Sequence, residues 1–237
     1  MSDEQKTYDP VGRRSHTVGI QGALDKFHAE MPEGTVALNV GCGQQRMDGF
    51  VNVDFMPDDA VDVVCNLFEP NWPFADQSVG FVYMNNFLEH VPGTAWATLW
   101  SELWRVSAEG ARIMVISPHA RSDRYLQDPT HCQPIIDRKF MYLSKEWRVG
   151  NKLNHGYYCH PDVNFLMDIR PWKLWHNDVS MREDSAKLWA ELHDTNAIED
   201  QIWFLKAFRT PEALESYKRI IEARMNGQDE QGQSIEV

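Results

Sequence analysis

Short apolar runs separated by polar turns fill the first third of the chain. Four of them span 35–40, 50–55, 61–67 and 79–85, each rich in β-branched or aromatic residues and bounded by Gly, Pro, Asp or Asn. Because apolar residues are nearly continuous in each run, both faces of the corresponding strands should be buried. The pattern therefore predicts four central strands of a parallel sheet.

A helical period follows these runs. In the segment 94–110, apolar residues recur at i, i+3, i+4, i+7 and i+8, and they are Trp96, Leu99, Trp100, Leu103 and Trp104. We interpret them as one helix face that docks on the sheet. Another buried strand, 111–119, comes next, and the order strand, helix, strand is typical of a parallel α/β sheet.

The remaining segments complete a single α/β domain. Alternation over 163–169 and the apolar run 202–208 predict two further strands, while 21–31, 135–147, 182–193 and 211–225 predict helices. Residues 1–20 lack apolar periodicity and are expected to form an arm. The expected fold is a mostly parallel seven-stranded sheet with helices on both faces.

The same pattern divides the chain into three parts. They are an N-terminal arm and helix (1–34), the sheet domain (35–210) and a C-terminal helix with a polar tail (211–237). Inside the sheet domain, residues at about 120–160 hold no convincing strand and are rich in His, Tyr, Arg and Asp. An irregular segment of this length inside a domain is usually functional, so we expect it to be a substrate-side insertion.

Charge and composition exclude several classes of protein. A net charge of -12 over 237 residues repels phosphate backbones, so a long nucleic acid is not the expected partner. No apolar run approaches the roughly 18 to 20 residues of a membrane span, and the polar N-terminus lacks a signal-peptide core. The 4 cysteines are expected to be reduced thiols. The sequence therefore predicts a cytoplasmic protein with no membrane partner.

Candidate chemistry begins at the motif "LNVGCG", where Gly41 and Gly43 directly follow the first predicted strand. In open α/β sheets, ligands bind outside the carboxyl ends of the strands, where glycine lets the backbone approach them. Asp54 ends the second strand, where its carboxylate can accept hydrogen bonds from both hydroxyls of a ribose. Position 46 is Arg46, whereas the dinucleotide fingerprint needs a third glycine there. The pattern favours a nucleoside without pyrophosphate, and a plain tight turn without ligand is the alternative.

The first crossover is short. The seven residues from Gln44 to Phe50 separate the glycine turn from the second strand. A parallel crossover that contains a full helix takes about ten to twelve residues or more. We therefore expect a single helical turn or a loop in place of the first crossover helix.

Four ordered blocks between Thr35 and His131 resemble the class I S-adenosylmethionine-dependent methyltransferases. The blocks are "LNVGCG", "VNVDF", "WPFADQSVGFVYMNNFLEHV" and "LWRVSAEGARIMVISPH". The abbreviated first crossover is similar to that of a bacterial and phage subgroup with the pattern "LNLGCGxxxxxGyxNVD". The resemblance implies a Rossmann-like fold, S-adenosylmethionine as cofactor and methyl transfer as the reaction.

Carried over to this chain, the resemblance implies nine cofactor-binding residues. Gly41 and Gly43 would approach the methionine part, and Asp54 would hold the ribose. Asn66 and its neighbour would border the adenine, although a strand-end turn is an alternative role for Asn66. The full set is Gly41, Cys42, Gly43, Asp54, Phe55, Asn66, Leu67, Asn85 and Asn86. The chain departs from the family at Asn39, Asn66 and Gly80, where acidic residues are common.

The substrate side is expected after the fourth and fifth strands. The element "DPTH" resembles one seen beside the active site in the same subgroup, and it suggests His131 as general base with Asp128 as its orienter. His119, at the end of the fifth strand, is a third candidate. The alternative is that Asp128 caps its own turn while His131 merely packs. Adjacent His and Cys side chains at 131–132 and 159–160 rarely converge on one ion, and no CxxC spacing is present, so no metal site is predicted.

Basic residues are frequent between 118 and 152, where the segment contains seven of them and four acidic residues, a net charge of +3. This contrast with the whole chain suits an anionic acceptor, and a solvated face is the alternative. The leading hypothesis is a methyltransferase for a small-molecule, sugar, glycan or nucleotide-like acceptor. The rivals are an NAD- or nucleotide-sugar-dependent enzyme on a related sheet and a catalytically idle binding or structural module.

Overall fold

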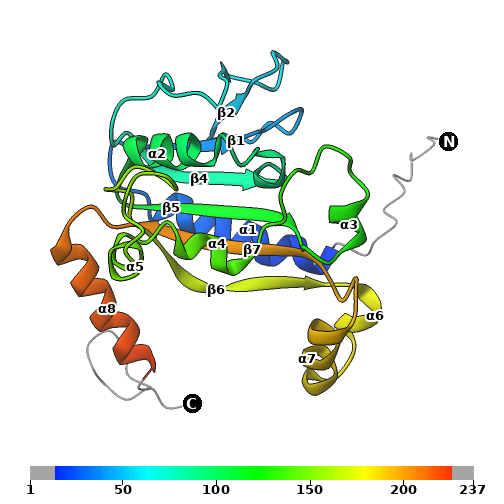
Figure 1. Ribbon diagram of the computed structural model, residues 1–237. Helices are drawn as coiled ribbons and strands as arrows, with labels where there is room; N and C mark the ends of the chain where they lie inside the picture. The colour runs from blue at the N-terminus through cyan, green and yellow to red at the C-terminus, as the bar shows by residue number, and fades with distance from the viewer. Residues whose placement is uncertain (1–13, 226–237) are drawn as a thin grey trace.

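A seven-stranded sheet forms the centre of the molecule (Figure 1). The computed structural model describes residues 14–225. In sheet order the strands are β3 (Val63–Val64), β2 (Val51–Asp54), β1 (Val36–Val40), β4 (Val79–Asn85), β5 (Ser107–Pro118), β7 (Ile198–Ala207) and β6 (Phe165–Trp175). Strand β7 is antiparallel to both of its neighbours, and the other pairings are parallel. The predicted mostly parallel seven-stranded α/β fold is confirmed.

Helices cover both faces of this sheet. In chain order they are α1 (Arg14–Ala29), the 3₁₀ helix η1 (Leu88–His90), α2 (Trp96–Val106), α3 (Asp123–Leu126), α4 (Asp137–Met141), α5 (Lys145–Gly150), α6 (Asn177–Ser180), α7 (Asp184–His193) and α8 (Pro211–Met225). In Figure 1, α1 lies behind the sheet and α2, α4 and α5 lie in front of it. The α6–α7 pair and α8 lie near opposite ends of β6.

The tryptophan-rich face of α2 packs on the sheet as its period predicts. Leu99, Trp100 and Leu103 are fully buried. The Trp100 and Trp104 rings meet the edge of Phe165 in β6, with ring centroids 5.8 and 5.5 Å apart. Edge-to-face aromatic pairs of this kind stabilise a core beyond the area they bury. The docking of this helix face is confirmed.

Helix α1 packs on the opposite face and is longer than its sequence pattern indicates. Phe27 lies edge-on to Phe81 of β4 and Phe204 of β7, with ring centroids 5.8 and 5.5 Å apart. The helix begins at Arg14, so the prediction of an arm through residue 20 was wrong from that point on. A helix held by tertiary contacts can extend beyond its apolar stripe, since each added residue gains one hydrogen bond. Residues 1–13 and 226–237 lie outside the described part.

Two other predicted segments have different bounds in the structure. The strand expected over 61–67 is reduced to the edge strand β3, because only Val63 and Val64 pair with β2. The helix expected over 135–147 is divided into α4 and α5. Ser144 begins α5, since its hydroxyl accepts a hydrogen bond from the backbone N–H of Trp147.

The crossover from β1 to β2 contains turns and no helix, as its length predicts. The fully buried side chain of Asn52 holds these turns in place. Its Oδ1 accepts the backbone N–H of Met47 at 2.8 Å and the side-chain amide of Asn39 at 2.9 Å. Its Nδ2 donates to Asp62 Oδ2 at 2.8 Å and to two backbone carbonyls. One amide thus fixes the loop that carries the glycine turn.

Replacing Asn52 by alanine is expected to lower the free energy of unfolding by about 3 kcal/mol, because each buried polar group left without a partner costs roughly 1–3 kcal/mol. The matched control is Asn151→Ala, where an exposed amide is lost and a change within about 0.5 kcal/mol is expected. Urea unfolding of both variants provides the measurement. Equal losses in the two variants would contradict the proposed role of Asn52.

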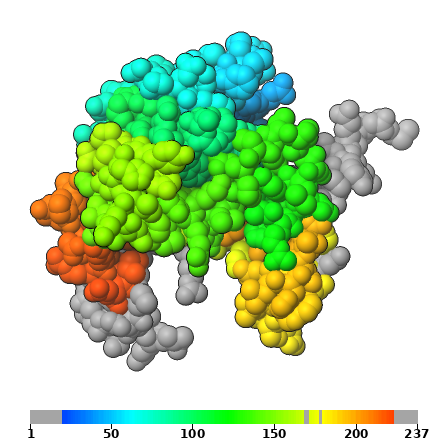
Figure 2. Space-filling model, viewed as in Figure 1, coloured from blue at the N-terminus to red at the C-terminus, as the bar shows by residue number. Residues whose placement is uncertain are grey.

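A buried arginine organises the irregular segment between β5 and β6. Arg148 is 1% exposed, and its guanidinium donates to the carbonyls of Tyr142 and Val163, both at 2.7 Å, and to Asn154 Oδ1 at 3.1 Å. The segment therefore has a fixed shape without strands of its own. In Figure 2 it covers much of the face on which α2 lies.

Candidate functional site

Two adjoining cavities lie over the carboxyl ends of β1, β2 and β4. The first has a volume of about 660 Å³ and is lined by Gly41, Asp54, Phe55, Cys65, Asn66, Leu67, Phe68, Asn86, Phe87, His90 and Thr130. The second has a volume of about 580 Å³ and is lined by Asn39, Gly41, Cys42, Gly43, Gln44, Gln45, Arg46, Met47, Tyr83, Asn85 and Asn86. Gly41 and Asn86 line both. All nine residues that the sequence implicates in cofactor binding therefore surround one composite site.

Asp54 is held rigidly at the end of β2. Its Oδ2 accepts the backbone N–H of Gly43 at 2.9 Å, and its Oδ1 accepts that of Met56 at 3.0 Å. The residue is 8% exposed and lines the first cavity. Each carboxylate oxygen has two lone pairs, so each keeps one for a ligand hydroxyl. This arrangement can bind a vicinal diol without rearranging the turn.

The glycine turn brings backbone to the wall of the site. Gly41 has φ +65° and Gly43 has φ +51°, a left-handed conformation that favours glycine. A Cβ on Gly41 would lie 2.2 Å from a ring atom of Phe87, whereas one on Gly43 would enter open space. Asn86, at the end of β4, is also left-handed with φ +51°. A non-glycine residue in this conformation, such as Asn86, is found at many functional sites.

Apolar rings line the part of the site between β2 and the turn after β3. Phe55, Leu67, Phe68 and Phe87 contribute to this wall, and the centroids of the last two rings lie 6.2 Å apart. The Asn66 amide is engaged in its own turn, with Oδ1 accepting the Phe68 N–H and Nδ2 donating to Glu69. The wall suits a flat apolar group such as a nucleobase.

Cys42 lies in the turn as a buried thiol. Burial, followed by the nearby charge of Asp54, raises its pKa to about 11. A thiol with this pKa stays protonated at neutral pH and is a poor nucleophile. Cys42 therefore contributes packing and backbone to the site.

Three titratable side chains meet beside the first cavity. One ligand-type atom from each of Glu89, His90 and His131 lies within 4.8 Å of the other two. Glu89 is fully buried, and neither of its carboxylate oxygens has a hydrogen-bond partner. Burial raises its pKa to about 7, opposed by its own backbone N–H, the nearby Ser117 hydroxyl and His131, although neither the N–H nor the hydroxyl has the geometry of a hydrogen bond to the carboxylate. His90, which lines the cavity, has a pKa lowered by burial and by His131.

His131 is oriented by a backbone carbonyl. Its Nδ1 lies 2.8 Å from the carbonyl oxygen of Tyr125, which can only accept, so Nδ1 carries the proton. Its Nε2 lies 3.9 Å from Glu89 Oε1 and 3.9 Å from Asp128 Oδ2. The orienting contact thus comes from the Tyr125 carbonyl and not from Asp128, the orienter predicted from the sequence.

Asp128 caps its own turn. Its Oδ1 accepts the backbone N–H of Thr130 at 2.8 Å and the Thr130 hydroxyl at 2.6 Å, and these bonds lower its pKa. His119 does not line either cavity of the composite site. Its charged neighbours are Arg121, Glu191, Lys173 and Asp137, and burial followed by Arg121 lowers its pKa. The structure therefore brings Asp128 and His131 together and places His119 elsewhere.

In a chelator-containing buffer, Glu89→Gln is expected to stabilise the protein. The folded-state pKa lies above the unfolded one, so the ionised carboxylate costs stability increasingly as pH rises from about 4.5 to about 7. The free energy of unfolding that wild type loses over this pH range amounts to about 3 kcal/mol. The variant should unfold at higher urea concentration than wild type at pH 8 and at a similar concentration at pH 5. A gain of equal size at both pH values would contradict the burial of an ionisable Glu89.

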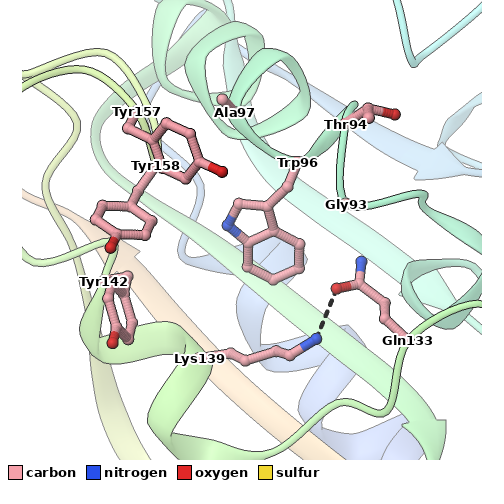
Figure 3. A pocket seen from close by; sticks show the side chains of 9 residues that line it. All are labelled: Gly93, Thr94, Trp96, Ala97, Gln133, Lys139, Tyr142, Tyr157 and Tyr158. Atoms are coloured by element: carbon pink, nitrogen blue, oxygen red, sulfur yellow. Dashed lines mark hydrogen bonds between the residues drawn. The ribbon is translucent and has the colours of Figure 1, made fainter.

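A third cavity of about 430 Å³ opens between the start of α2, α4 and the loop after α5 (Figure 3). Its walls are largely aromatic and include Trp96, Tyr142, Tyr157 and Tyr158. Lys139 Nζ lies 5.4 Å from the Trp96 ring centroid and donates to Gln133 Oε1 at 2.6 Å. Flat rings around one ammonium group suit the C–H face of a sugar ring or a planar ligand.

Most basic residues counted in 118–152 make structural contacts. Arg148 is buried, Arg124 pairs with Asp200 at 3.0 Å, and Lys145 pairs with Asp162 at 2.7 Å. Arg121 donates to backbone carbonyls at the end of α7. Lys139 is different, because it lines the aromatic cavity. Of the seven, only Lys139 lines the aromatic cavity, so an anion site there would depend on Lys139.

Sequence reasoning missed several residues of the site, above all Glu89 and His90. Both belong to the quoted fourth-strand block, and the signal there was a Glu-His pair set between Leu88 and Val91. The structure buries that glutamate completely. Phe68, Phe87 and Thr130 also line the site without having been singled out.

Comparison with known proteins supports the architecture. No protein-family model matches the chain, and no curated protein matches it in sequence. A SAM-dependent methyltransferase from Archaeoglobus fulgidus is similar in structure, with TM-score 0.55 and 15% identity over 82% of this chain and 94% of that one. Geranyl diphosphate C-methyltransferase from Streptomyces coelicolor A3(2), solved with Mg2+, geranyl diphosphate and S-adenosyl-L-homocysteine, has TM-score 0.50 and 15% identity over 84% and 80%. The chain thus has the Rossmann-like fold of these enzymes.

No helix among residues 14–225 is both long and apolar enough to cross a lipid bilayer.

Proposed function

We propose that this chain is an S-adenosylmethionine-dependent methyltransferase that acts on a small-molecule acceptor. The observation that carries the proposal is Asp54, whose oxygens each keep a lone pair toward a cavity that the Gly41 turn also lines. A carboxylate in this position suits the two ribose hydroxyls of a nucleoside. The fold that the chain shares with methyltransferases supports the same reading.

The residues present fit this cofactor in three parts. Asp54 would hold the ribose, and the apolar wall around Phe68 would hold the adenine. Gly43, with open space over its α-carbon, would let the backbone approach the methionine part together with Asn86. When bound, the cofactor supplies an electrophilic methyl group on a sulfonium sulfur. The chain then contributes mainly by positioning the acceptor, an effect worth up to roughly 7–11 kcal/mol.

The crossover loop argues against the NAD-dependent alternative. Dinucleotide enzymes bind pyrophosphate at the N-terminus of the helix that follows the glycine turn. Here that segment contains turns only, and Arg46 at the position of the third glycine pairs with Asp62 at 2.8 Å. A nucleoside ligand without pyrophosphate therefore fits better. The loop also supports the resemblance to the bacterial and phage subgroup, which stays part of the proposal.

The aromatic cavity in Figure 3 is our candidate for the acceptor site. Gly93 and Thr94 line it and follow η1 closely in the chain, and Gln133 connects it to the same region through a bond to the Val91 carbonyl at 2.6 Å. Its rings would stack on a sugar, glycan or nucleotide-like acceptor. Lys139 would favour acceptors with one negative group.

Calorimetry with S-adenosylmethionine, S-adenosylhomocysteine and NAD tests the cofactor. Binding of the first two and not of NAD is expected, and the reverse would overturn the proposal. Activity is tested by adding cofactor with a labelled methyl group to fractionated lysate. Label in a small-molecule fraction supports the enzyme, whereas tight binding without transfer to any fraction would favour the idle module.

A further inference from the structure

We propose that Glu89, His90 and His131 form a binding site for one divalent transition-metal cation. The three side chains come from η1 and from the loop after α3, and their ligand-type atoms lie within 4.8 Å of one another. The two segments are also joined through the backbone, since the Glu89 carbonyl accepts the N–H groups of Cys132 and Gln133 at 3.0 and 3.3 Å. The cluster is therefore a fixed part of the fold.

Glu89 is the first argument for a ligand. Its side chain is fully buried, and both carboxylate oxygens lack a hydrogen-bond partner. A buried carboxylate without partners is costly, and folded proteins normally pair such a group or use it to bind a metal. One of its oxygens lies 3.9 Å from His131 Nε2, which leaves the space between them for an ion that both would contact.

The imidazoles are prepared as metal ligands by their outer contacts. Nδ1 of His131 donates to the Tyr125 carbonyl, which leaves the Nε2 lone pair on the side of Glu89. The Thr130 hydroxyl donates its proton to Asp128, so its oxygen accepts from Nδ1 of His90 at 3.0 Å and leaves that ring's other nitrogen unprotonated. Metal-bound histidines almost always have their second nitrogen fixed in this way.

The ligand set selects the kind of cation. Two imidazole nitrogens and one carboxylate suit Mn²⁺, Fe²⁺, Co²⁺ or Zn²⁺, whereas Mg²⁺ and Ca²⁺ prefer oxygen ligands. Three protein ligands leave coordination positions open, and His90 and Thr130 also line the first cavity. The open positions would thus be reachable by an oxygen of a ligand bound in that cavity, which the proposed function assigns to the cofactor. Only this last step rests on the proposed methyltransferase function.

Cobalt titration of the chelator-stripped full chain, without cofactor, tests the site directly. Wild type is expected to bind one Co²⁺ per chain, seen by calorimetry and by visible d–d absorption that reports ordered nitrogen and oxygen ligands. Glu89→Gln and His131→Ala should each bind Co²⁺ at least about tenfold more weakly. Mn²⁺ and Zn²⁺ should compete for the site, and a large excess of Mg²⁺ should not.

The controls separate ligand loss from misfolding. Glu222→Gln and His160→Ala change exposed residues of the same types outside the cluster and should bind Co²⁺ like wild type. The melting temperature of each variant, measured without metal, shows whether weaker binding comes from unfolding. Wild-type affinity in Glu89→Gln, or no Co²⁺ bound by wild type, would overturn the proposal. If the chain binds S-adenosylhomocysteine but no Co²⁺, only the metal site is excluded. If it binds Co²⁺ but no S-adenosylhomocysteine, only the proposed function is excluded.

Discussion

Asp54→Ala is expected to lower the affinity for S-adenosylhomocysteine at least about 100-fold. The carboxylate accepts two backbone N–H groups and lines the cavity with its remaining lone pairs, so each ribose hydroxyl would make a charge-assisted bond. Such a bond contributes roughly 1.5–3 kcal/mol, and about 1.4 kcal/mol corresponds to tenfold in affinity. Calorimetry gives the affinity, and the shift of melting temperature by the ligand gives an independent measure.

Two further variants make this result specific. Asp54→Asn keeps a side-chain oxygen for one backbone N–H, so the turn should persist while the charge is lost. It should therefore bind more weakly than wild type and more tightly than Asp54→Ala. Asp59→Ala removes an exposed carboxylate from the loop between β2 and β3 and should leave the affinity for S-adenosylhomocysteine unchanged. Unchanged affinity in Asp54→Ala would remove the ribose assignment and the main support for the cofactor.

The central strands were predictable because their sequence signal is local. Strand β4 is buried at six of its seven positions, and a continuous apolar run between polar turns is what such a strand requires. The short crossover was equally predictable, since seven residues cannot hold a helix and two turns. The bounds of β3 could not be read in this way, because an edge strand ends where its partner stops pairing.

Site residues at strand ends were also predictable, because topology brings them to one edge of the sheet. Asp54 and Gly41 follow neighbouring strands, and both line the same cavity. Arg148 shows the opposite case. Its sequence context indicates a charged surface, while the structure buries its guanidinium among carbonyl oxygens contributed by distant turns. The meeting of Glu89 with His131 likewise depends on how the insertion folds back over η1, which no periodicity encodes.

His131→Ala is expected to lower turnover about 10²- to 10⁴-fold, because loss of a group that acts on the reacting atoms raises mainly the free energy of the transition state. Turnover is measured on the acceptor that the labelling experiment identifies. Affinity for S-adenosylhomocysteine should stay near that of wild type, since His131 does not line the cofactor cavities. His160→Ala, at an exposed histidine, should leave both quantities unchanged.

The same variant distinguishes three roles for His131. A general base would leave Co²⁺ affinity intact, and added metal would not restore turnover. A metal ligand would lower Co²⁺ affinity together with turnover, and millimolar Mn²⁺ would recover part of the rate by filling the weakened site. A packing role, through the stacking of its ring on Tyr125 at 5.3 Å, would lower the melting temperature while the folded fraction kept its turnover. We expect the second pattern, because Nε2 of His131 lies on the side of a buried carboxylate that has no other partner. A stable His131→Ala protein with wild-type turnover would exclude both chemical roles and leave acceptor positioning to the aromatic cavity.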